Sequence, residues 1–160
     1  MKARRLADGQ RRREAERHQQ EAERRSQAEQ ALADRRRQAE AAESQAHAEK
    51  LAYLALFVSG ALKKAAREGR TTTWEEIAEK TGQRQLARLT HQDKLSLLET
   101  IEKNTLPGSP LRSAVLAAAG IGEALHLHRE VSQLLQRDVP DEDSDLVLHL
   151  RADCVRLQRQ

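Results

Sequence analysis

The stretch Leu51-Ala-Tyr-Leu-Ala-Leu-Phe-Val58 decides the fold, because it is the first dense run of large apolar side chains in a chain of 160 residues. The segment before it consists mainly of Arg, Glu, Gln and Ala. Such a segment can form a solvated helix but has too little apolar surface to build a core alone. The sequence therefore predicts an all-α protein with a charged helical segment at residues 1–50 and a compact bundle of about six short helices at residues 51–160.

The composition limits both the core and the chemistry of any site. The chain contains one Trp, one Tyr and one Phe, so Leu, Ala, Val and Ile must fill the core. We expect such a thin core to be completed by a partner. The single cysteine, Cys154, excludes an internal disulfide framework and a multi-cysteine zinc site, which fits a reducing cytosol.

No segment of the sequence is expected to enter a membrane. Residues 1–50 contain no apolar stretch of the kind found in secretory signals. The first apolar run extends only to Leu62, which is well short of the roughly 20 apolar residues that span a bilayer. We therefore expect a cytoplasmic protein without a membrane partner.

Residues 1–50 have the composition of one long helix. No proline or glycine occurs between Arg11 and Glu49, and most residues there are strong helix formers. A short apolar seam follows the alternating spacing of four and three residues that is typical of coiled coils, with a break at Arg35. Its members are Ala28, Leu32, Ala39, Ala42 and Ala46. Because alanine buries little surface, two interpretations remain: a homodimeric coiled coil and a single charged helix.

Arginine clusters in the same segment suggest contact with nucleic acid, because arginine neutralises phosphate well. One of these clusters is Arg11, Arg12 and Arg13. Acidic residues are interleaved, however: residues 1–50 contain 13 Lys or Arg and 10 Asp or Glu, so this segment accounts for the whole net charge of +3. The competing interpretation is a solvated helix face.

Turn signals divide residues 51–160 into helices. The helix that contains Leu51–Val58 is expected to stop near Glu68-Gly69. Thr73 is placed to cap a helix that begins at Trp74, and Gly82 is placed to end it. We expect Trp74 to join Tyr53 and Phe57 in one buried aromatic cluster.

The segment around Gly82 resembles a helix-turn-helix corner. Ala78 lies four residues before this turn glycine, as in DNA-binding helix-turn-helix motifs. A recognition helix would then cover residues 83–89 and present side chains suited to reading base edges, namely Gln83, Arg84, Gln85 and Arg88. The alternative is an ordinary helical corner, because Gln83 is not apolar and Thr90 already starts the next helix.

The remaining segments contain residues that typically begin and end helices. Thr90 is expected to cap a helix, and the Pro107-Gly-Ser-Pro110 stretch breaks the chain after it. Three more helices are predicted: Leu111–Ala119, ended by Gly120 and Gly122; a helix through Ala124–Leu135; and a helix after Pro140.

The sequence supplies no constellation for catalysis, a cofactor or a metal ion. There is no phosphate-binding glycine loop, nucleophile elbow or HExxH pair. His126 and His128 suggest a metal pair, but residues two apart on a helix point about 200 degrees apart. We therefore assign no catalytic, cofactor-binding or metal-ligating residues.

Three turn segments resemble a small helical region of actinobacterial CoiA-like and uncharacterised proteins. They are residues 69–74, 110–115 and 139–141, and the resemblance covers about residues 69–160. CoiA-like proteins are associated with DNA uptake and recombination through a nuclease-like region that this sequence does not contain. The resemblance implies a bacterial protein in a DNA-related or mobile-element setting, and no activity.

Two main functional hypotheses follow, and a third, a small enzyme or nuclease subunit, would need a missing partner to supply its site. The first is a non-enzymatic adaptor or scaffold in which residues 51–160 bind a protein partner and residues 1–50 serve as a dimerisation element or spacer. The second is a DNA-binding regulator that uses the helix-turn-helix-like segment at residues 74–89 together with the arginine-rich N-terminal segment.

Overall fold

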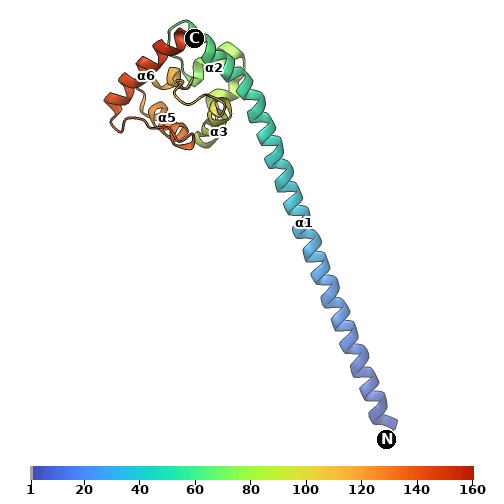
Figure 1. Cartoon of the computed structure of the whole chain (residues 1–160). Coiled ribbons are helices and arrows are strands. Elements are labelled where there is room, and N and C mark those ends of the chain that lie inside the picture. Colours follow the sequence, from blue (N-terminus) through green and yellow to red (C-terminus); the bar gives the residue numbers. More distant parts are fainter. Residues whose placement is uncertain (1) are drawn as a thin grey trace. The chain divides into compact units, whose positions relative to one another are not determined.

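The computed structural model describes residues 2–160 and, from Arg4 onward, their side chains. All regular structure in this range is helical, which confirms the predicted all-α fold with a long N-terminal helix leading into a compact helical bundle. The chain divides into two units. We call residues up to His47 the arm unit and Ala48–Gln160 the head unit, in which Figure 1 labels α2, α3, α5 and α6.

Helix α1 spans Lys2–Arg67, and every side chain described from Arg4 to Lys50 is exposed. Its residues in the head unit instead contribute one apolar face to the core, which includes Leu54, Val58 and Leu62. The helix ends at Arg67, next to the predicted Glu68-Gly69 stop, and Gly69 in the turn that follows adopts a left-handed conformation with φ of 65°. A side chain at this glycine would lie 2.7 Å from Nε2 of Gln158, so the turn also needs the close approach that glycine allows.

The predicted caps of the next helices are confirmed. Helix α2, Trp74–Thr81, begins where the Thr73 hydroxyl accepts a hydrogen bond from the Glu76 amide, and it ends at Gly82 with φ of 72°. After the 3₁₀ helix η1, Arg84–Arg88, helix α3 spans His91–Glu102. The Thr90 hydroxyl caps α3 by accepting a hydrogen bond from the Asp93 amide.

The predicted helix at Leu111–Ala119 is wrong in length, because α4 covers only Ala114–Ala117. The amides of Ala114 and Val115 donate to carbonyl groups three residues earlier, so the chain makes turns here before α4 begins. The Ser113 amide donates a hydrogen bond of 2.8 Å to the Glu102 carboxylate. Gly120 ends this region with φ of 81°, as predicted.

Two longer helices complete the head unit: α5, Gly122–Leu134, and α6, Asp143–Gln158. Gly122, which was expected to belong to the turn before this helix, is the first residue of α5. Helix α4 packs against both α5 and α6, and α3 packs against α5. All four residues of α4 are buried, so α4 lies at the centre of the bundle. The core consists mainly of leucine, alanine and valine, with Trp74 as its one buried aromatic residue within the described range.

No helix within residues 2–160 is long and apolar enough to cross a membrane.

Helix α6 offers a direct test of this packing. Leu150 is fully buried in the core, whereas Leu148 on the same helix is 63% exposed. Leu150→Ala should lower the free energy of unfolding by about 2–5 kcal/mol, because it removes buried methyl groups and leaves a cavity. Leu148→Ala is the matched control and should change it by less than about 0.5 kcal/mol. Urea unfolding followed by circular dichroism measures both, and equal losses would contradict this packing.

Candidate functional site

The residues predicted to contact DNA lie in two places. Arg11, Arg12 and Arg13 are exposed on α1 in the arm unit. In the head unit, Arg84 and Arg88 are exposed, whereas Gln83 and Gln85 are half-buried and form a side-chain hydrogen bond of 3.4 Å with each other.

The segment predicted as a recognition helix is the 3₁₀ helix η1. Its five residues rise by about 2 Å each and therefore extend over about 10 Å. Two local features limit its length: the left-handed turn at Gly82 precedes it, and Leu89 already has extended backbone because α3 starts after Thr90. Leu86 anchors η1 in the core. This geometry is that of a tight helical corner.

The residues of the predicted dimer seam are all exposed on α1. Leu32, the largest of them, is 52% exposed, and the four alanines are exposed as well. This exposure leaves the whole seam accessible within the arm unit. Both interpretations of residues 1–50, a homodimeric coiled coil and a single charged helix, are compatible with it.

The sequence prediction missed two large apolar residues with the same spacing. Tyr53 is 54% exposed and Leu56 is 73% exposed, so the predicted burial of Tyr53 beside Trp74 is wrong. Tyr53 instead makes an edge-to-face contact with Phe57, with ring centroids 5.1 Å apart. Glu49, Tyr53 and Leu56 follow Ala46 at intervals of three, four and three residues, so they continue the coiled-coil spacing of the seam. The sequence signal was present but was hidden, because Tyr53 and Leu56 stand within the apolar run that builds the core.

Helix α6 has a second exposed apolar stripe. Leu148, Ala152 and Val155 are exposed and lie four and three residues apart, which places them on one face. The opposite face of α6 buries Leu146, Leu150 and Leu157. This helix therefore presents apolar surface to solvent in addition to its core contacts.

The head unit contains a pocket of about 680 Å³. It is lined by the loop around residues 103–111, by the second half of α5 with the residues after it, and by residues 149, 153 and 156 of α6. Two arginine side chains in this lining form hydrogen bonds with the backbone of the loop. Arg137 donates to the carbonyl oxygens of Thr105 and Leu106, and Arg156 donates to that of Gly108. These hydrogen bonds indicate that the lining chiefly fastens a loop to two helices.

His128 contributes a buried imidazole to this pocket. Its Nδ1 lies 3.1 Å from the hydroxyl oxygen of Ser113, and burial is the main reason that its pKa falls to about 4. Neighbouring His149, Arg129 and Arg137 lower this pKa further through charge repulsion. Ser113 is itself buried and does not line the pocket, so this pair does not present a nucleophile to a ligand.

Ser132 supplies the one buried side-chain polar atom without a hydrogen-bond partner among the described residues, its hydroxyl oxygen. Ser132 also lines the pocket. Buried hydroxyl groups normally form hydrogen bonds, so this oxygen is an exception among the buried polar atoms of the described residues.

The two histidines considered as a metal pair diverge. The side chain of His126 is 66% exposed, whereas His128 is buried. They therefore do not share an ion, as their spacing predicted. Cys154 is a half-buried free thiol, and burial raises its pKa.

Comparison with known proteins gave no match to a family model, a curated protein or a solved structure. Functional conclusions therefore depend on the residues of the chain itself.

The lowered pKa of His128 predicts a stability change with pH. In the unfolded chain this imidazole has the ordinary pKa of 6.5, whereas in the folded chain the pKa is about 4. Between these values only the unfolded state takes up the proton, so stability is lost as the pH falls from about 6.5 to about 4. The loss from this group should be about 3 kcal/mol. Urea unfolding at several pH values measures this dependence. As the pH falls, the free energy of unfolding should decrease less in His128→Gln than in the wild type.

The control for this measurement is His18→Gln in the arm unit, where the side chain is exposed, and it should retain the wild-type pH dependence. Burial raises the pKa of Glu102, so this carboxyl group makes the folded state more stable as the pH falls, opposite to His128. Its contribution is present in the wild type and in both variants. An NMR titration of His128 in the wild type gives an independent readout. A midpoint near 6.5, or equal pH dependence in wild type and His128→Gln, would contradict the prediction.

Proposed function

We propose that this protein is a non-enzymatic adaptor of the bacterial cytoplasm, which dimerises through α1 and binds a protein partner with its head unit. The observation that carries the proposal is the set of exposed apolar residues at coiled-coil spacing on α1. They are Ala28, Leu32, Ala39, Ala42, Ala46, Tyr53 and Leu56. The exposed α6 stripe of Leu148, Ala152 and Val155 supports a partner surface on the head unit.

The energetics of the seam depend on its few large residues. Burying a leucine-sized side chain contributes about 1.5–3 kcal/mol, whereas a methyl group contributes about 0.8 kcal/mol. In a two-fold dimer each residue contributes from both copies. Leu32, Tyr53 and Leu56 therefore provide most of the driving force, and the alanines mainly allow the helices to approach closely.

Two charged residues in the seam favour an antiparallel pair. In a parallel pair, Arg35 and Glu49 would each lie opposite the same residue of the second copy, and like charges would repel at both positions. An antiparallel pair centred on Ser44 places Leu32 opposite Leu56. It also places Arg35 opposite Tyr53, where a guanidinium can lie over an aromatic ring. We therefore propose the antiparallel arrangement.

Adjacent alanines test the seam with one type of substitution. Ala42 lies in the seam, whereas Ala41 lies outside it, and both are exposed. Ala42→Asp should convert the dimer to a monomer in size-exclusion chromatography with light scattering, because a carboxylate in the seam loses its hydration. Ala41→Asp carries the same cost in helix propensity and should remain dimeric. A monomeric wild type, or the same mass for both variants, would overturn dimerisation through this seam.

Disulfide cross-linking tests the orientation. In a Cys154→Ser background, Leu32→Cys and Leu56→Cys chains should each stay uncross-linked alone. Their mixture should form a cross-linked dimer on a non-reducing gel after mild oxidation, because the antiparallel pair places these two positions opposite each other. Efficient cross-linking of Leu32→Cys with itself would instead indicate a parallel pair.

DNA binding is the second candidate function, and one observation favours it. Arg84 and Arg88 are exposed, and neither forms an ion pair with another described residue. The resemblance to CoiA-like proteins agrees with a DNA-related setting. The short 3₁₀ geometry of η1 provides less reach into a groove than an α-helix. Adding duplex DNA to the same chromatography separates the candidates, because comigration would favour the regulator over the adaptor.

A further inference from the structure

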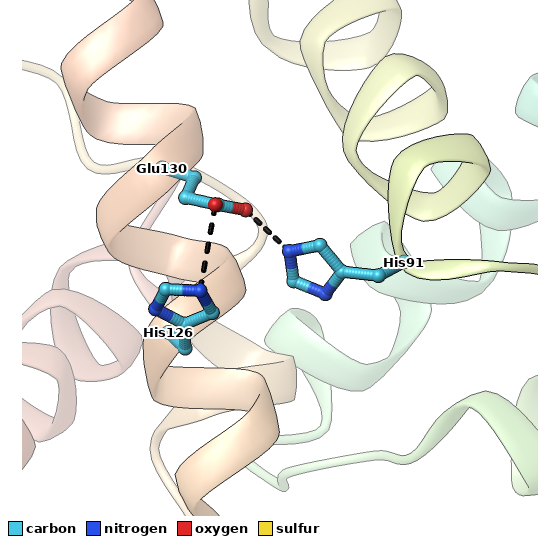
Figure 2. Close-up of side chains that lie close together, drawn as sticks. All are labelled: His91, His126 and Glu130. Carbon is cyan, nitrogen blue, oxygen red and sulfur yellow. Dashed lines mark hydrogen bonds and ion pairs between the residues drawn. The ribbon is translucent and has the colours of Figure 1, made fainter.

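Three side chains with metal-ligating chemistry converge from two helices of the head unit (Figure 2). His91 is the first residue of α3, and His126 and Glu130 lie one turn apart on α5. One ligand atom from each lies within 4.8 Å of the other two. Within residues 4–160 this is the one group of three such residues.

The fold fixes this convergence. Helix α3 packs against α5, and Lys94 Nζ on α3 lies 3.2 Å from Glu123 Oε1 on α5. The cap at Thr90 sets where α3 begins and therefore where His91 lies. His126 and Glu130 share a face because residues four apart on a helix point the same way. Sequence reasoning missed the cluster, because His91 and Glu130 are far apart in the sequence.

The donor atoms already face one point. Nε2 of His91 contacts Oε2 of Glu130, and Nε2 of His126 lies 3.4 Å from Oε1 of the same carboxylate. Figure 2 shows both imidazole rings directed toward this carboxylate, and their centroids are 5.3 Å apart. A tetrahedral zinc ion with bonds of about 2.0–2.1 Å holds its donors about 3.3 Å apart. Small side-chain shifts are therefore enough to place an ion between them.

We propose that His91, His126 and Glu130 form a binding site for a divalent zinc-type ion. Two imidazole nitrogens and a carboxylate are a donor set that suits Zn²⁺ better than Mg²⁺ or Ca²⁺, which prefer oxygen ligands. The side chains are half-buried or exposed, so the fourth position of the ion is open to water. The ion links α3 to α5. This proposal is independent of the adaptor function.

The surrounding charges are compatible with a cation. Lys94 is paired with Glu123, and Arg129, the residue beside Glu130, is paired with Asp143 at 2.6 Å. The positive end of the α3 dipole opposes the ion, and the carboxylate of Glu130 offsets it. Without an ion, His91 and Glu130 form a hydrogen bond between the two helices, so the experiment must separate metal binding from that contact.

Isothermal titration of the full chain with Zn²⁺ alone, in chelator-treated buffer, tests the site. We expect one strongly bound ion per chain and a rise in Tm that EDTA reverses. His91→Gln, His126→Gln and Glu130→Gln should each weaken binding by at least about tenfold, since even residues that only orient ligands change metal affinity by that much.

The control is His149→Gln. His149 and Asp153 on α6 are also four residues apart, with the same 3.4 Å nitrogen–oxygen distance as His126 and Glu130, and they belong to no cluster of three. This variant should bind Zn²⁺ as the wild type does. Wild-type affinity in His126→Gln, or an equal loss in His149→Gln, would overturn the assignment.

Cobalt spectroscopy of the wild type keeps the proposal testable if a variant fails to fold. Co²⁺ in a site of low coordination number gives intense visible absorption, which added Zn²⁺ should remove. A spectrum identical to that of Co²⁺ in buffer would also overturn the proposal.

Discussion

The buried carboxylate of Glu102 connects three parts of the head unit. It lies at the end of α3 and accepts hydrogen bonds from the Ser113 amide, at 2.8 Å, and from the Thr105 hydroxyl, at 2.9 Å. The Ser113 hydroxyl in turn lies 3.1 Å from Nδ1 of His128 on α5. Burial raises the pKa of Glu102, and the Ser113 and Thr105 hydrogen bonds oppose that rise. This chain of polar contacts fixes where the 103–113 loop ends and α4 begins.

The position of α4 determines the packing around it. All four of its residues are buried and two of them are alanines, so α5 and α6 can both pack closely against it. The backbone of Val115 also accepts a hydrogen bond from the Thr72 amide, which ties the segment after α1 to the centre of the bundle. A core with one aromatic residue relies on such close packing because it has few large side chains to fill gaps. The arginine contacts of the pocket complete this arrangement by holding the intervening loop.

The sequence predicted those features that depend on neighbouring residues. The caps at Thr73 and Thr90 and the turns at Gly69 and Gly82 were predictable because each depends on a few adjacent side chains. The length of α4 was not, because a carboxylate eleven residues away takes the Ser113 amide. The cluster of His91 with His126 and Glu130 was equally hidden, since only the packing of α3 on α5 brings them together. Most helix boundaries could therefore be predicted from neighbouring residues, whereas the cluster of three metal-ligating side chains depends on tertiary contacts.

Helix α1 explains why the adaptor proposal and the thin core belong together. In the head unit, one face of α1 buries Leu54, Val58 and Leu62, whereas Tyr53 and Leu56 lie on the opposite face and are exposed. A helix with apolar residues on two opposite faces is typical of a helix that is covered on both sides. The chain covers one face with its own core. The other face continues the coiled-coil spacing of the sequence beyond Ala46, and for this reason the partner proposed for it is a second α1.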